Sequence, residues 1–188
     1  MSIKTKNILI ILSIVTVFVC SCKSNKQKED AAKIVNEWIG KEIKFPENIS
    51  CYFSGIDTIP ELCSEQFKKD FKILLYVDSA GCSECRLELF EWKLLMEEAD
   101  SLFHGKLGFL LYFQPKNVRD VLYLFSGSQF KYPVFMDTKG LINNENNFPQ
   151  EMQYQCFLLG GDNKVLMLGN PVLNPRIWEL YKELITKN

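Results

Sequence analysis

Two cysteines separated by two residues, Cys82 and Cys85, are the strongest chemical feature of the chain. They follow a continuous apolar run, Phe71–Val77, and precede a long segment with helical spacing, Arg86–Phe103. A cysteine at the amino end of a helix meets unpaired backbone N–H groups and the positive end of the helix dipole, which stabilise a thiolate. We therefore expect Cys82 to attack disulfides, and Cys85, one turn further on, to resolve the mixed disulfide.

Charged residues beside this motif are expected to tune its reactivity. Glu84 lies between the two cysteines and should raise the pKa of the Cys82 thiol, whereas Arg86 should lower it. Asp78 is the nearest acid on the amino-terminal side, where it can serve as a base or cap the loop. The charges of Glu84 and Arg86 thus act in opposite directions on the same thiol.

The cysteine pair also has two interpretations without redox exchange: a static disulfide, or half of a zinc site. Zinc takes about four ligands, and the other candidates, Cys51, Cys63, Cys156 and His104, are scattered along the chain. We therefore expect redox exchange and no metal. Cys51 and Cys63 are near enough in sequence to pair, although free buried thiols are an equal alternative. Cys156 lies in an apolar run and is expected to be a buried core residue.

The pattern of apolar residues predicts an α/β domain whose central mixed sheet is flanked by helices. In chain order we expect a hairpin or edge strand over 43–53, a strand at 71–77, a helix at 86–103, a strand at 106–113, a helix capped by Asn117, a strand at 132–136, a hairpin over 154–168 and a helix from 175. The buried face of the long helix is predicted to be Leu87, Phe90, Leu94 and Leu95. Residues 57–69 are a mixed polar segment, and residues 143–147 are expected to form a polar loop.

The first 21 residues have the features of a secretion signal. Lys4 and Lys6 precede the apolar run Ile8–Val19, which is too short to cross a bilayer comfortably. The run ends in Val19-Cys-Ser-Cys22, which resembles a bacterial lipobox and predicts acylation of Cys22; an uncleaved anchor is the alternative. The expected parts are a signal peptide over 1–21, a polar tether over 22–33 and a folded domain over 34–188.

The overall composition excludes some classes of function. The chain has 188 residues, 47% of them hydrophobic, with 22 basic and 23 acidic side chains and a formal net charge of -1. This amount of apolar material suits one packed core, and the lack of a basic excess argues against nucleic acid as a partner. His104 is the only histidine, so catalysis that depends on histidine is not expected.

Three stretches of the sequence resemble the thioredoxin superfamily, in particular its exported, membrane-tethered thiol-disulfide oxidoreductases. Phe71–Arg86 resembles the family's strand and C-x-x-C helix, Tyr132–Asp137 its "YPVLLD" segment, and Phe157–Val165 its "FLIDxxGKV" hairpin. The resemblance covers about Phe45 to Ile185. It implies a thioredoxin-like fold and an enzyme that exchanges disulfides with protein thiols and needs no bound cofactor.

The resemblance also implies a direction of exchange and a location. The tethered relatives favour reduction of partner disulfides, with electrons from a separate membrane donor. Lys23 follows the acylated Cys22 where an aspartate would favour the inner membrane, so the bilayer expected is the outer membrane of a bacterial cell envelope. The domain would then lie in the periplasm or at the cell surface.

Three positions depart from the family pattern, and one of them is Gly81, where the family has an aromatic residue before the first cysteine. Tyr154 stands where the family has a cis-proline opposite the cysteines, and we expect a trans bond because a cis bond before tyrosine costs about 3 kcal/mol. Tyr76 stands where thioredoxin has a buried carboxylate, and a phenol is not a ready base at neutral pH. The missing cis-proline is the main feature that favours an alternative to the enzyme: a non-enzymatic redox-sensing or protein-binding module on the same fold.

Overall fold

The computed structural model describes residues 26, 28–53, 56–57, 60–78 and 88–187. The chain divides into two units, Met1–Trp38 and Ile39–Asn188. In the first unit a helix spans residues 28–38 and so begins inside the segment expected to be a tether, while the signal segment and Cys22 lie outside the described residues. No helix among the described residues is long and apolar enough to cross a membrane.

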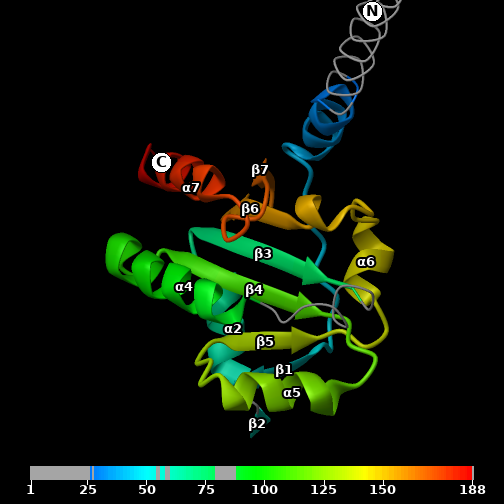
Figure 1. Ribbon diagram of the computed structural model, residues 1–188, viewed down its shortest axis with the longest axis vertical. Coiled ribbons are helices and arrows are strands. Elements are labelled where there is room, and N and C mark those ends of the chain that lie inside the picture. Colours follow the sequence, from blue (N-terminus) through cyan, green and yellow to red (C-terminus); the bar gives the residue numbers. More distant parts are fainter. Residues whose placement is uncertain (1–25, 27, 54–55, 58–59, 79–87, 188) are drawn as a thin grey trace, which may run out of the picture. The chain divides into compact units, whose positions relative to one another are not determined.

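The second unit alternates strands and helices in the order that the apolar pattern predicts (Figure 1). Its strands are β1 (Ser50–Phe53), β2 (Ile56–Asp57), β3 (Phe71–Val77), β4 (Leu107–Phe113), β5 (Pro133–Met136), β6 (Cys156–Gly160) and β7 (Val165–Leu168). Its helices are α2 (Pro60–Phe67), α4 (Leu89–Phe103), α5 (Val118–Gly127), α6 (Leu141–Asn146), the 3₁₀ turn η1 (Met152–Tyr154) and α7 (Pro175–Lys187).

The described strands form one sheet in the order β2-β1-β5-β4-β3-β6-β7. β4 pairs in parallel with both β3 and β5, and the other pairs are antiparallel. The carboxyl ends of β3, β4 and β5 therefore lie at one edge of the sheet (Figure 1). Every residue of β3 and β4 is buried, as their continuous apolar runs predict. The predicted mixed sheet between helices, with an amino-terminal hairpin formed by β1 and β2, is confirmed.

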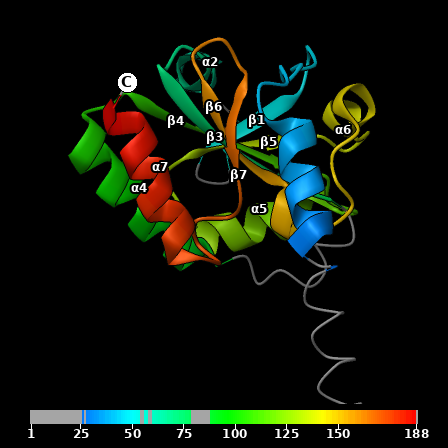
Figure 2. The ribbon, with the colours of Figure 1, turned by 90° about the horizontal axis from the view of Figure 1, so that it is seen from above.

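Helices α4, α5 and α7 cover one face of the sheet (Figure 2). They contribute Trp92, Phe125, Trp178 and Tyr181 to a single buried cluster. The odd-numbered residues of β3 and β4 belong to the same cluster, because alternate side chains of a strand point to opposite faces. This face holds the larger part of the apolar core.

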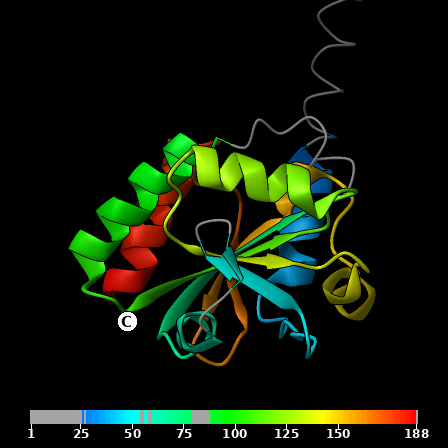
Figure 3. The ribbon, with the colours of Figure 1, turned by 90° about the horizontal axis from the view of Figure 1, so that it is seen from below.

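Helices α2 and α6 lie on the opposite face (Figure 3), which is rich in aromatic rings. Tyr112 of β4 and Phe135 of β5 stack with ring centroids 4.7 Å apart, and Phe67 of α2 meets Phe135 edge-on at 5.5 Å. A disulfide between Cys51 and Cys63 links β1 to α2. The second face is thus held together partly by a covalent bond.

Several local predictions of turns and helix caps are confirmed. The β6–β7 turn closes with the Asn163 N–H donating to the Gly160 carbonyl at 3.0 Å, and Asn163 has a positive φ of 63°. Asn117 caps α5 by accepting from the Arg119 N–H at 3.0 Å. His104 ends α4 in the left-handed conformation, where a helix commonly terminates.

Two polar segments, 57–69 and the loop expected at 143–147, contain short helices. α2 begins at Pro60, whose fixed φ suits a first helical turn. α6 replaces the loop expected at 143–147, because Asn146 is held by distant backbone groups. Its side-chain amide accepts from the Lys44 N–H at 2.9 Å and donates to the Lys44 carbonyl at 2.7 Å. Lys44 is 102 residues away from Asn146 in the sequence, so a local pattern could not have revealed this partner.

The predicted buried face of the long helix is partly wrong. Phe90 and Leu94 are 67% and 49% exposed, whereas Leu95 is buried as predicted. The helix packs instead through Trp92, Leu95, Met96, Ala99 and Phe103. The sequence of α4 has apolar residues on two faces, and packing against the sheet selects the face that contains Trp92.

Candidate active site

The C-x-x-C motif lies between the end of β3 and the beginning of α4. β3 ends at Val77, and the half-buried Asp78 follows it. α4 begins at Leu89, with the exposed Glu88 as its N-cap residue, and not at Arg86 as expected. The intervening residues 79–87 lie outside the described residues, and they include Cys82, Glu84, Cys85 and Arg86.

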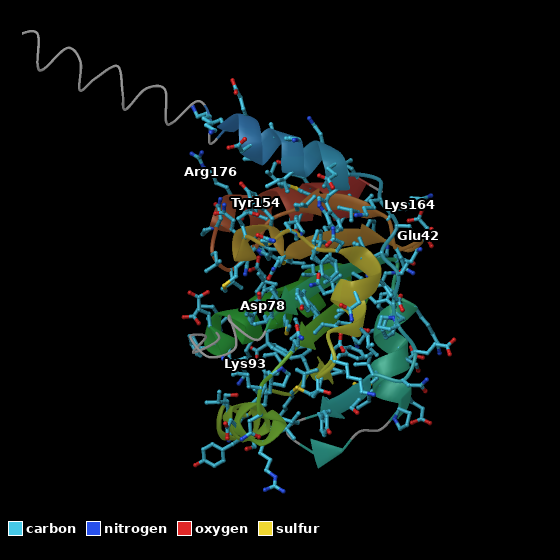
Figure 4. The ribbon with its side chains drawn as sticks, turned by 90° about the vertical axis from the view of Figure 1, so that its right-hand side faces the viewer. Glu42, Asp78, Lys93, Tyr154, Lys164 and Arg176 are labelled. Atoms are coloured by element: carbon cyan, nitrogen blue, oxygen red, sulfur yellow. A yellow bond between two sulfur atoms is a disulfide. The ribbon has the colours of Figure 1, made fainter. Side chains whose placement is uncertain are left out.

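The end of β3 is connected to the neighbouring strands of the sheet. The Gln114 N–H donates to the Val77 carbonyl at 2.8 Å, and the Tyr76 N–H donates to the Gln155 carbonyl at 2.9 Å. Figure 4 looks onto the carboxyl-end edge, and in this view Asp78 lies between Tyr154 above and Lys93 of α4 below. The structure therefore brings two of the predicted supporting residues, Asp78 and Tyr154, to the edge from which the C-x-x-C segment departs.

Tyr76 forms a polar contact just beneath this edge. Its side chain is 2% exposed, and its hydroxyl donates to Gln114 Oε1 at 2.7 Å. Burial, together with the negative charges of Asp78 and Asp137, raises the pKa of Tyr76 to about 12. Tyr76 is therefore a neutral hydrogen-bond donor at neutral pH, in agreement with the prediction that it does not replace the carboxylate as a base.

Asp137 is a buried acid that the sequence analysis included in a motif without assigning it a role. It directly follows β5 and is 1% exposed. Its Oδ2 accepts from the Ile142 N–H at 2.8 Å, while its Oδ1 has no hydrogen-bond partner within the described part of the chain. Asp137 and Asp78 each directly follow an apolar strand. This position is the sequence signal that could have drawn attention to Asp137.

Comparisons with known proteins identify the fold. No family model matches the chain, and no curated protein matches it significantly. Similar solved structures include a putative thiol:disulfide interchange protein DsbE from Chlorobium tepidum, with 12% identity and a TM-score of 0.53 over 78% of this chain and 96% of that chain. A putative protein disulfide isomerase from Bacteroides thetaiotaomicron has 14% identity and a TM-score of 0.53, over 78% and 87% of the two chains. PrxQ from Xylella fastidiosa, as a mutant, has 13% identity and a TM-score of 0.52, over 79% and 96%.

The fold is thioredoxin-like. At identities of 12–14% these similarities establish the architecture, and the activities named for the neighbours are properties of those proteins. The likeness agrees with the element order and the mixed sheet described above.

The segment before β6 differs from the pattern expected of a thioredoxin-like domain. Tyr154 ends the 3₁₀ turn η1 and is half-buried. The described residues contain no cis peptide bond, so the bond before Tyr154 is trans, as its side chain predicts. Gln155, the next residue, is 3% exposed and donates through Nε2 to the Pro149 carbonyl at 2.8 Å. The turn at this edge is thus fixed by hydrogen bonds to β3 and to the loop before it.

The remaining cysteines of this thioredoxin-like domain have distinct environments. The pairing that was left open for Cys51 and Cys63 is a disulfide. Cys156 is fully buried, as predicted, and burial raises the pKa of its thiol well above the usual range. Among the described residues, no group of three or more His, Cys, Asp or Glu side chains could hold a metal ion.

Proposed function

We propose that the protein is a thiol-disulfide oxidoreductase that acts on other proteins through Cys82 and Cys85. The observation that carries this proposal is the place of the C-x-x-C sequence in a thioredoxin-like fold, between the buried parallel strand β3 and the long helix α4. Asp78, which directly follows β3, supplies one acid beside this connection.

In the proposed reaction the protein reduces a disulfide of its partner. The Cys82 thiolate attacks one partner sulfur, a mixed disulfide forms, and the other partner sulfur leaves as a thiolate that takes up a proton. The Cys85 thiolate then attacks the Cys82 sulfur, which releases the second partner thiol and leaves a Cys82–Cys85 disulfide. The partner gains two electrons and two protons, and a membrane dithiol donor returns them to this protein.

The proposal includes a lipid anchor, which rests on the sequence alone. A signal peptide over residues 1–21 would be removed, Cys22 would be acylated, and the domain would be held at a bilayer of the bacterial envelope, with the outer membrane favoured. Incorporation of labelled palmitate into the full chain tests this step. Cys22→Ser is expected to abolish incorporation, whereas the matched variant Cys20→Ser is expected to retain it; the reverse result would contradict the assignment.

The test of the enzymatic proposal combines turnover with alkylation. The full chain should reduce insulin disulfides with dithiothreitol as electron source, and Cys82→Ser should abolish this turnover. Alkylation of each cysteine, followed by mass spectrometry across pH, should give Cys82 an apparent pKa below the free value of about 8.5. Cys85→Ser should keep the reactive Cys82 and accumulate the mixed disulfide, while Cys156→Ser, a change at a buried thiol, serves as the control.

A second candidate is a non-enzymatic redox-sensing or protein-binding module. The trans bond before Tyr154, at the position where the family has a cis-proline, favours it. This candidate predicts ordinary titration of both thiols and no insulin reduction in the same experiment. That pair of results would overturn the enzymatic proposal while leaving the fold unchanged.

A further inference from the structure

A cavity of about 530 Å³ opens on the face of the sheet opposite α4. It lies between the segment that leads into β1, helix α2, and the aromatic residues of β4 and β5. Its lining consists of Pro46, Asn48, Ile49, Ser50, Cys51, Pro60, Cys63, Ser64, Phe67, Tyr112 and Phe135. The volume is within the range of about 300–1,000 Å³ that small-molecule sites usually have.

None of the described residues that line this cavity is charged. Charged side chains make up 24% of the whole chain, so an uncharged lining is a local property of this surface. A charged ligand would lose its hydration here without gaining a partner of opposite charge, which is unfavourable. The lining therefore selects against ions and favours neutral molecules.

Aromatic rings and a disulfide form the walls of the cavity. Tyr112 and Phe135 stack with centroids 4.7 Å apart, and Phe67 meets Phe135 at 5.5 Å. The Cys51–Cys63 disulfide joins the β1 wall to the α2 wall. Rings that enter such a lining can stack or pack edge-on, so an aromatic ligand fits better than a flexible aliphatic one.

Tyr112 adds one polar group to this apolar lining. The residue is 1% exposed and lines the cavity, and its hydroxyl makes no hydrogen bond with a described residue. Burial and the charge of Asp137 raise the pKa of Tyr112 above the ordinary range for a phenol, so the group keeps its proton at neutral pH. A neutral phenol without a partner is available to donate to an acceptor on a ligand.

From the uncharged aromatic lining and the unpartnered Tyr112 hydroxyl, we infer that this cavity binds a small, uncharged aromatic molecule that carries a hydrogen-bond acceptor such as a ketone. The aromatic part of the ligand contacts Phe67 and Phe135, and its acceptor atom accepts a hydrogen bond from the Tyr112 hydroxyl, which keeps its proton. No step of this proposal uses Cys82 or Cys85, and its test does not depend on the proposed oxidoreductase activity.

Benzophenone, an uncharged aromatic ketone, is the probe for this site. Under near-ultraviolet light its carbonyl abstracts a hydrogen from a nearby C–H bond, and the two radicals combine to form an adduct that contains all atoms of both molecules. The full chain in detergent is labelled, digested and analysed by mass spectrometry, which separates labels in the apolar run at 8–19 from labels at 46–67. We expect saturable labelling at 46–67, half-maximal below about 1 mM.

A matched pair of variants tests whether the cavity is the labelled site. Ser64 on α2 lines the cavity, whereas Ser126 on α5 does not; both are exposed, and both donate to the carbonyl three residues earlier. Ser64→Trp should fill the cavity and reduce labelling at 46–67 at least tenfold, while Ser126→Trp should leave it unchanged. If Ser64→Trp does not fold by circular dichroism, Ser50→Phe fills the same space from β1.

A second pair of measurements tests the role of the Tyr112 hydroxyl. Two competitors of the benzophenone label are compared: 2-acetonaphthone, which has a carbonyl, and 2-ethylnaphthalene, which does not. Tyr112→Phe keeps the ring and removes the donor, so it should weaken competition by 2-acetonaphthone about fivefold and leave 2-ethylnaphthalene unaffected. Equal effects on both competitors would contradict the role of the hydroxyl.

The proposal is overturned if labelling at 46–67 does not saturate, or if the folded Ser64→Trp and Ser126→Trp variants are labelled equally. It is also overturned if Ser64→Trp abolishes self-association of the chain in sedimentation experiments, because the cavity would then be an interface between copies. Loss of insulin reduction with labelling intact would contradict only the proposed oxidoreductase, so the two proposals fail separately.

Discussion

The two faces of the sheet are stabilised in different ways. On one face, the long helices α4, α5 and α7 bury a continuous apolar cluster that includes Trp92, Phe125 and Trp178. On the other, the short helices α2 and α6 cover an aromatic layer, a disulfide and several buried polar groups. The extra covalent and polar contacts occur on the face with the shorter helices.

Two buried polar residues of the second face, Lys72 and Asn146, are held by long-range hydrogen bonds. Lys72 lies in the middle of the apolar run of β3 and is fully buried, and its Nζ donates to the Gly161 carbonyl at 3.0 Å. Burial lowers the pKa of Lys72, although the charge of Asp162 opposes this effect. A face built in this way can keep an open cavity, because its rigidity does not depend on filling every space with apolar side chains.

Truncating one phenylalanine on each face should give the largest difference between them. Phe125 is 1% exposed and lies between Phe113 and Phe130, so Phe125→Ala should lower the free energy of unfolding by about 4 kcal/mol. Phe135→Ala should cost about 2–3 kcal/mol, because the space it vacates joins a cavity that is already open. Urea denaturation of both variants measures the difference, and equal costs would show that the two faces are equally well packed.

Removal of the disulfide tests whether the second face needs its covalent link. The bond closes a loop between residues that are 12 apart in sequence, so Cys51→Ser/Cys63→Ser should lower the free energy of unfolding by about 3 kcal/mol. The matched variant Ser50→Ala/Ser64→Ala changes adjacent exposed positions on the same two elements and should stay within about 0.5 kcal/mol of wild type. A double-cysteine variant as stable as wild type would mean that packing alone holds α2 in place.

The sequence is informative about the first face and much less so about the second. The apolar run of β3, the helix cap at Asn117 and the turn at Asn163 depend on neighbouring residues, and the structure confirms them. Helix α6 depends on the pairing of Asn146 with Lys44, which are 102 residues apart. No local pattern contains that contact, and the expected loop at 143–147 was wrong for this reason.

The candidate site likewise contains some residues that could be identified from the sequence and others that could not. Asp78 could be placed beside the cysteines from its position in the sequence, and Tyr154 opposite them from the resemblance to the thioredoxin superfamily. Asp137 is notable because it is buried and because its charge raises the pKa values of Tyr76 and Tyr112. The spacing of residue types along the sequence does not predict that an acid is buried. The pairing of Cys51 with Cys63 likewise required coordinates, since their separation in sequence allows free thiols equally well.

The smallest expected effect concerns the Tyr76 hydroxyl, a polar contact of the second face that lies next to the candidate site. Tyr76→Phe leaves Gln114 Oε1 without its donor and should cost about 1 kcal/mol at pH 7. The pKa of Tyr76 is raised from 10.0 to about 12 by folding, so its contribution to stability is present below pH 10 and is lost as the pH rises from about 10 to 12.

The free energy of unfolding of wild type should therefore fall more steeply between pH 10 and 12 than that of Tyr76→Phe, because only wild type must ionise a phenol at this site. The other buried tyrosines titrate in both proteins, so the difference between the two curves isolates Tyr76. Tyr123→Phe, at a side chain that is 79% exposed, is the matched control and should run parallel to wild type. Parallel curves for Tyr76→Phe and wild type would mean that the fold does not desolvate this hydroxyl. They would contradict the buried hydrogen bond from Tyr76 to Gln114 beneath the candidate site.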